Sequence, residues 1–353
     1  AQGININVGT FASGGSGGSN VTLTDSGVNG GPTLDGVSMG AGGNFNYTLA
    51  ANDLAINYVT TTGNVNLTAS AGNINDNVND STADVTGNAV TLTANGVGKG
   101  IGASGGSLDT NAGSLTLNVG SLGASIAETG DLTLNASTVA SDGNLNITAA
   151  SGLTVAGNQA LTGSSTITLD ADADDNASGD MTVNSGVIIS TQDQAISLAG
   201  NNLVLSTTGT DINAGTAGVT LTPSGSQTVG LGGGAGTFSV SDAELDRVTT
   251  SGTITIGSTA AGNLAFSGVT AGANNLALLS GGDVTAGDLT TTGNVSVTTP
   301  GGNINDDVFD GTADITANAI TLTANGSGKG VGTDANGALD TDAGSITLNV
   351  GSG

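Results

Sequence analysis

Residues 61–98, TTGNVNLTASAGNINDNVNDSTADVTGNAVTLTANGVG, return at residues 291–328 as TTGNVSVTTPGGNINDDVFDGTADITANAITLTANGSG. The two stretches stand 230 positions apart, and about two-thirds of their positions are identical. Within each copy apolar residues alternate with Thr, Ser or Asn, as in VNLT at 65–68 and VTLT at 90–93. Alternation with a period of two predicts β-strands that bury one face.

The same short pattern recurs along the whole chain. Each instance is bounded by Gly, Asn, Asp or Ser, and further examples occupy residues 21–24, 115–118, 132–135, 145–148, 167–170, 219–222, 254–256, 320–323 and 346–349. Helical periodicity is absent, and Glu, Lys, Arg and Gln, which favour helices, are nearly missing. The chain is therefore predicted to be all-β.

Composition decides between the all-β architectures. The chain has 62 Gly but only five Phe, two Tyr and no Trp. A β-sandwich needs larger side chains to fill its core, whereas a parallel β-helix fills a narrow interior with Val, Leu, Ile and Ala. We therefore predict one continuous β-solenoid over residues 1–353, an elongated rod with coils of about 20 residues. Disorder is disfavoured because β-branched residues recur at regular spacing.

The duplication extends beyond the first two stretches. After a one-residue insertion, LDTNAGSLTLNVG at 108–120 matches LDTDAGSITLNV at 339–350. This indicates a super-repeat of about 230 residues that covers 61–290 and restarts at 291–353. Solenoids tolerate such copying because each coil contacts only its neighbours. We expect the open ends to stack on other copies, or on the rest of a longer chain.

Charge excludes several classes of partner. The chain carries 29 acidic and three basic residues, no His and a net charge of −26. Nothing is present to neutralise phosphate, so nucleic-acid binding is excluded. No apolar run approaches the roughly 20 residues of a membrane span, so membrane insertion is not expected. Divalent cations would relieve the self-repulsion of so acidic a chain.

The densest group of acids is the predicted metal site. The segment LDADADDNASGD supplies carboxylates at alternating positions, from Asp170, Asp172, Asp174, Asp175 and Asp180. Oxygen ligands in a loop suit Ca²⁺, although the bidentate Glu of an EF-hand and the GGxGxD motif of calcium solenoids are both missing. The alternative is a solvated turn in which Asp side chains accept bonds from nearby amides. No cofactor is required under either interpretation, and calcium is an optional ligand.

A second polar group is duplicated. One copy holds Asn73, Asn75, Asp76, Asp80 and Asp84, and the other holds Asn303, Asn305, Asp306, Asp310 and Asp314. A cation site would explain the match, but so would stacked side chains at coil corners or recent duplication alone. The two explanations without a metal are favoured over a cation site.

Catalysis is disfavoured by the inventory of side chains. Without His or Cys, the Ser-His and Cys-His nucleophile systems are unavailable. A β-helix lyase would need a base beside its acids, and the three bases are scattered at Lys99, Arg247 and Lys329. A glycosidase needs two carboxylates at a fixed separation, which the many Asp residues do not exclude. We predict that the chain is not an enzyme.

Residues 229–266, with DAEL followed by TITIGSTAAGN, resemble repeats of filamentous-haemagglutinin-like giant bacterial exoproteins and adhesins. Residues 96–120 and 328–352, with LDT ahead of a strand, are similar to further repeats of that family. The resemblance implies a right-handed parallel β-helix, secreted to the cell surface, that acts in adhesion, aggregation or the biofilm matrix. The amino-terminal secretion domain of many such proteins is not recognisable.

These observations predict a rigid extracellular fibre or cell-surface adhesin stalk. One alternative is a module that binds a glycan or receptor through the loops at 170–180 or 241–248. A second alternative is a β-helix enzyme that degrades polysaccharide.

Overall fold

The computed structural model describes residues 3–8, 18, 20–27, 31–39, 42–102, 106–209, 211–333 and 337–351. The fold is all-β: parallel strands stack as a β-solenoid of about 14 turns, with successive turns roughly 23 residues apart. The β-solenoid prediction is confirmed. The turns are slightly longer than the 20 residues expected, because the loops between the short strands vary in length. Contacts divide the chain into two compact units.

The first unit comprises residues 1–170 and 187–192. Its strands are β1 (Gly3–Val8), β2 (Val21–Asp25), β3 (Thr33–Met39), β4 (Phe45–Leu49), β5 (Leu54–Ile56), β6 (Val59–Thr60), β7 (Val65–Ala69), β8 (Ile74–Asp76), β9 (Val85–Ala94), β10 (Gly100–Ile101), β11 (Leu108–Val119), β12 (Gly123–Glu128), β13 (Asp131–Leu134), β14 (Thr138–Val139), β15 (Leu145–Ala149), β16 (Gly152–Val155), β17 (Gln159–Ala160), β18 (Ile167–Asp170) and β20 (Ile188–Ser190).

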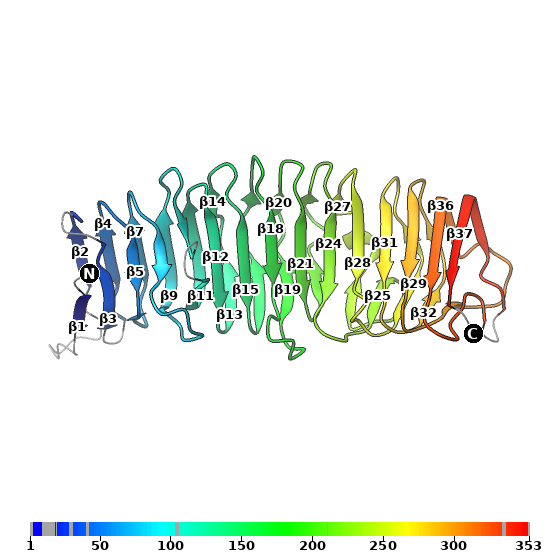
Figure 1. Cartoon of the computed structure of the whole chain (residues 1–353), viewed down its shortest axis with the longest axis horizontal. Coiled ribbons are helices and arrows are strands. Elements are labelled where there is room, and N and C mark those ends of the chain that lie inside the picture. The colour runs from blue at the N-terminus through cyan, green and yellow to red at the C-terminus, as the bar shows by residue number, and fades with distance from the viewer. Residues whose placement is uncertain are drawn as a thin grey trace. The chain divides into compact units, whose positions relative to one another are not determined.

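Parallel pairing in the first unit stacks like residues on like. Phe45 of β4 pairs with Val65 of β7, which pairs with Val90 of β9, and Val90 pairs with Leu115 of β11. All four side chains are buried. Figure 1 shows these strands side by side in successive coils. The alternating pattern seen in the sequence therefore becomes a continuous apolar column inside the solenoid.

The second unit comprises residues 171–186 and 193–353. Its elements are β19 (Asp180–Val183), β21 (Ile196–Gly200), β22 (Leu203–Leu205), β23 (Asp211–Asn213), β24 (Val219–Pro223), β25 (Val229–Gly232), β26 (Phe238–Val240), α1 (Asp242–Leu245), β27 (Val248–Thr249), β28 (Thr253–Gly257), β29 (Leu264–Ser267), β30 (Val269–Thr270), β31 (Asn275–Leu279), β32 (Val284–Ala286), β33 (Leu289–Thr290), β34 (Asn294–Thr298), β35 (Ile304–Asp306), β36 (Ile315–Ala324) and β37 (Thr341–Val350).

The second unit repeats the same stacking rule. One column of paired residues runs through β21, β24, β28, β31, β34, β36 and β37, and its members are Ile196, Val219, Ile254, Leu276, Val295, Ile320 and Ile346. On the outside, Asn and Thr side chains form hydrogen-bonded ladders; the Asn318 amide, for example, donates to Asn294 at 2.9 Å. The column is aliphatic, and the polar ladder lies outside it.

Helix α1 departs from the expectation that 241–248 is an irregular loop. Ser241 caps the helix, and its hydroxyl accepts from the Glu244 amide while the Glu244 carboxylate accepts from the Ser241 amide at 2.9 Å. This is the capping box that the pattern Ser-x-x-Glu predicts. Leu245 is buried beneath it, so the segment is anchored to the solenoid. No helix among the described residues is long and apolar enough to cross a membrane.

Strand β37 leaves its apolar face uncovered. Ile346, Leu348 and Val350 are 49%, 57% and 55% exposed. The equivalent residues of β11 in the first copy are buried, because β13 and β14 pair with that strand. The contrast shows that a neighbouring coil, rather than the strand's own sequence, covers this face.

Candidate functional site

The parallel register brings three Asp residues together in the first unit. Asp76 ends β8, Asp84 immediately precedes β9, and Asp109 is the second residue of β11. Because Thr110 pairs with Val85, Asp109 lies one coil away from Asp84. The backbone amide of Asp84 donates to the Asp109 carbonyl at 2.8 Å. We call Asp76, Asp84 and Asp109 the buried triad.

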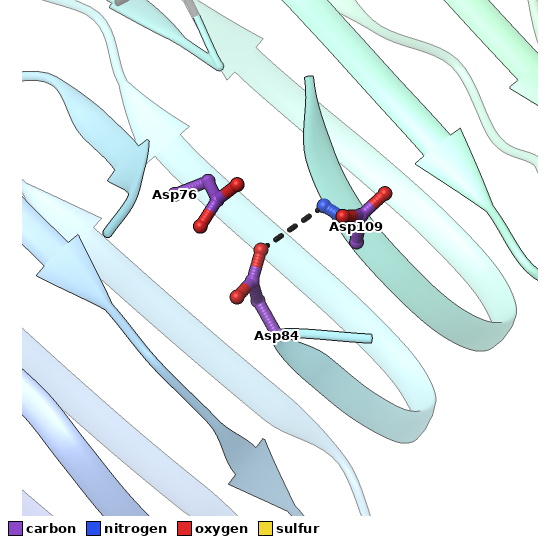
Figure 2. Close-up of side chains that lie close together, drawn as sticks. All are labelled: Asp76, Asp84 and Asp109. Carbon is purple, nitrogen blue, oxygen red and sulfur yellow. Dashed lines mark hydrogen bonds between the residues drawn. The ribbon is translucent and has the colours of Figure 1, made fainter. Parts of the chain in front are cut away.

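The carboxylates of the buried triad converge. Each residue contributes an oxygen that lies within 4.8 Å of the other two. Figure 2 shows the carboxylates of Asp76 and Asp84 facing one another, with Asp109 beside them. Their exposed fractions are 7%, 4% and 7%, in sequence order. The three acids therefore form one enclosed group inside the fold.

Hydrogen bonds satisfy only part of the buried triad. Oδ2 of Asp84 accepts from the Asp109 amide at 3.1 Å, and Oδ1 of Asp76 accepts from the Val78 amide at 2.7 Å. Oδ2 of Asp76 is enclosed and has no donor, and the Asp109 carboxylate meets no donor among the described residues. Buried polar atoms in native proteins nearly always have a partner, so Oδ2 of Asp76 calls for an explanation.

Burial and mutual repulsion raise the acid pKa values in the triad. Burial raises the pKa of Asp84 to about 8, opposed by the bond from the Asp109 amide and reinforced by the charges of Asp76, Asp109 and Asp80. Burial, with the charges of Asp76 and Asp80, raises the pKa of Asp109 to about 6. Near neutral pH the site therefore favours either a bound proton or a bound cation.

The second copy builds a related but more open group. Asp306, Asp307 and Asp314 also bring carboxylate oxygens within 4.8 Å of one another. The Asp340 amide donates to Oδ2 of Asp314 at 2.8 Å, which reproduces the contact between Asp109 and Asp84. However, Asp340 is only half-buried, and the third acid of the group is the exposed Asp307, where the first copy has Asn77. Burial raises the pKa of Asp314 to about 6.

Several of the other duplicated polar residues make structural hydrogen bonds. Oδ1 of Asn73 accepts from the Gly100 amide at 2.9 Å, and Asn303 does the same for Gly330 at 3.1 Å. Asp80 is exposed and accepts from the amide two residues ahead, at 2.7 Å. These contacts fit the interpretation as coil corners for Asn73, Asn303 and Asp80. Asn75 and Asn305 differ, because the Oδ1 atom of each is buried and has no hydrogen-bond partner.

The acids of the predicted calcium loop, residues 170–180, do not converge as those of the buried triad do. Asp170 belongs to the first unit, and Asp172, Asp174, Asp175 and Asp180 belong to the second. In the second unit, Asp174 accepts from the amide and side chain of Asn176, Asp175 from the Gly225 amide, and Asp180 from the Asn201 side chain. Asp172 is buried and accepts from the Ala177 amide at 3.0 Å.

Among the residues that the structure describes, the acids that converge within 4.8 Å are those of the two duplicated groups. The carboxylates of Asp172, Asp174, Asp175 and Asp180 are not among them, and calcium at this loop stays a prediction. Sequence reasoning missed Asp109 as a site residue. The available signal was the LDT motif, which occurs at 108–110 and again at 339–341.

Glu128 is a further buried acid in the first unit, and its hydrogen bonds explain it. Its carboxylate accepts from the Thr110 hydroxyl at 2.8 Å, from the Ala112 amide at 3.0 and 3.1 Å, and from the Gly130 amide at 3.3 Å. Burial nevertheless raises the pKa of Glu128, because these bonds only partly offset its desolvation. The role of Glu128 is to hold β11 against β12.

Comparison with known proteins gives no relative for this arrangement. No family model, no curated protein and no solved structure matches the chain.

Proposed function

We propose that the chain is a non-enzymatic structural segment of an extracellular fibre or cell-surface adhesin stalk, of the filamentous-haemagglutinin-like kind. The observation that carries the proposal is the parallel register within each unit, where coil after coil pairs through the backbone. Such ladders resist bending and extension, because every coil is bonded along its length to the next. Mechanical display at a surface uses that property directly.

The surface supports a structural role over a catalytic one. Two described depressions, of about 230 and 350 Å³, are lined without any acidic or basic side chain. The converging acids are in the buried triad and in its second-copy relative rather than in those depressions. The net charge of −26 also keeps such segments from aggregating sideways. We propose that the chain is secreted and that its partners are further coils, stacked end to end.

The test is direct imaging of the native material. Antibodies raised against residues 1–353 are applied to intact cells and to material shed from them, followed by cryo-electron microscopy of the labelled structures. We expect labelled extracellular filaments with an axial repeat near 4.8 Å from stacked strands. Labelling confined to the cell interior, or turnover of a polysaccharide by the purified chain, would refute the proposal.

A binding module is the second candidate, and one exposed side chain favours it. Phe309 is 80% exposed beside Val308, which is 54% exposed. The first copy has Asn at the equivalent position, 79, so the aromatic ring is particular to the second copy. Large exposed apolar patches mark interaction sites, whereas single exposed apolar side chains are ordinary, so the candidate rests on the presence of this ring in one copy alone. A glycan array that binds the wild-type chain but not Phe309→Asn would establish this candidate, and equal binding by both would eliminate this ring as the contact.

A further inference from the structure

We propose that Asp76, Asp84 and Asp109 together bind one divalent cation, and that the ion is Ca²⁺. The site lies within the first unit and is separate from the mechanical role proposed above. It also differs from the loop at 170–180 that the sequence suggested.

The first argument is the set of oxygens that have no donor. Oδ2 of Asp76 is enclosed without a hydrogen bond, and the Asp109 side chain is 7% exposed and meets no donor among the described residues. Figure 2 shows the carboxylates of Asp76 and Asp109 on the same side of Asp84. A cation placed between the three carboxylates would contact all of them at once. A single proton can bridge only one pair of oxygens.

The second argument is charge. With all three carboxylates ionised the triad would carry a charge of −3, and burying unpaired charge is strongly unfavourable, so either a proton or a cation must neutralise part of it. The ion pair that the described residues form is Lys99 with Asp53, at 3.7 Å, and it involves no member of the triad. A divalent cation would neutralise most of the charge.

The identity of the ion follows from ligand type and spacing. All three ligands are carboxylates, and the chain has no His or Cys that would favour zinc or copper. Two ligands on opposite sides of Ca²⁺ lie about 4.8 Å apart, whereas Mg²⁺ requires about 4.1 Å. The oxygens of the triad lie within 4.8 Å of one another, close enough to share one ion, and Ca²⁺ is favoured because it tolerates irregular oxygen geometry whereas Mg²⁺ demands a near-ideal octahedron.

Binding would have a local structural effect. Asp76 and Asp84 bracket the segment 77–82, which is exposed and includes Val78, 56% exposed. A cation shared with Asp109 would tie both ends of this segment to β11. The ion would therefore hold the base of a surface loop in place.

The test is equilibrium dialysis of the full chain against radioactive Ca²⁺ at neutral pH, after removal of metals by chelator. Because the acids of the second copy also converge, every protein carries Asp314→Asn to remove that group. We expect Asp109→Asn to lose one of the Ca²⁺ ions that this parent binds, or to bind that ion at least about tenfold more weakly. The matched control is Asp131→Asn, which removes an exposed carboxylate from the same unit and should bind as the parent does.

Two results would overturn the proposal. One is a parent that binds no Ca²⁺ at millimolar concentrations, and the other is equal binding by the parent and by Asp109→Asn. Circular dichroism checks that each variant is folded. If Asp109→Asn is unfolded, Asp76→Asn replaces it. As a second measurement, a melting temperature of the parent that rises with Ca²⁺ but less with Mg²⁺ supports the site. A melting temperature that neither ion moves contradicts it.

Discussion

Replacing Asp84 by Asn should stabilise the metal-free chain at alkaline pH and leave it unchanged at acid pH. The folded-state pKa of Asp84 is about 8, against an ordinary value of 3.8. At pH values between these two, the unfolded chain has released a proton that the folded chain retains. Stability is therefore greatest below about pH 4 and falls as the pH rises toward 8.

The magnitude follows from the size of the shift. Each pKa unit corresponds to about 1.4 kcal/mol, so a shift of about four units sets a ceiling near 5 kcal/mol at pH 8. Asp109, whose pKa is also raised, shares the proton uptake, so we expect Asp84→Asn to recover about 2 to 5 kcal/mol there. The Asn carbonyl can still accept from the Asp109 amide, so the substitution removes charge and keeps the hydrogen bond.

The assay is urea unfolding followed by circular dichroism at pH 4 and pH 8, with chelator present. The control is Asp131→Asn, whose exposed carboxylate has the same charge. An equal effect of both substitutions at pH 8 would refute the reasoning, because it would reduce the gain to a general loss of negative charge. A gain from Asp84→Asn that is as large at pH 4 as at pH 8 would refute it as well.

Three further predictions concern packing, turns and buried hydrogen bonds. Leu117→Ala should lower the free energy of unfolding by about 2 to 5 kcal/mol, because Leu117 is buried. Leu348→Ala, at the equivalent but 57% exposed position, should lower it by about 1 kcal/mol, and urea unfolding measures both changes. Gly257→Ala should abolish or severely weaken folding, because its Cβ would lie 2.1 Å from a backbone oxygen. Gly268→Ala is also at positive φ but in open space, so it should lower the free energy of unfolding by only about 1 kcal/mol. Thermal melts of the two variants measure the difference. Glu128→Ala should destabilise by about 2 kcal/mol or more, because it strands buried donors, and equal melting temperatures for variant and wild type would contradict this.

The strand pattern was predictable because it is local. The predicted strands at 21–24 and 65–68 correspond to β2 and β7 within a residue. The segment at 90–93 is instead the end of the longer β9, since residues ahead of it, from Val85 to Ala89, also pair with β11. Alternation reports which face of a strand is buried, but it does not report how far pairing continues past a corner.

The acid site was predictable only in part. Asp76 and Asp84 stood out because the duplication preserved them, although their side chains resembled ordinary corner residues. Asp109 lies 25 positions beyond Asp84, and the length of the intervening coil decides that the two meet. Where each coil closes depends on loops whose conformations are set by contacts with neighbouring coils. The alternating pattern therefore does not predict which residues of successive coils meet.

The sequence by itself determined the all-β class, the solenoid architecture and the super-repeat, because period-two alternation, scarce aromatics and internal identity are properties of the chain alone. Only the tertiary structure decided which of the acids share a site and which equivalent residues are covered. Leu117 and Leu348 are the same residue type in the same repeat position, yet one is buried and the other is 57% exposed. The physical reason is that burial and carboxylate proximity in a solenoid arise between coils, from register and neighbours.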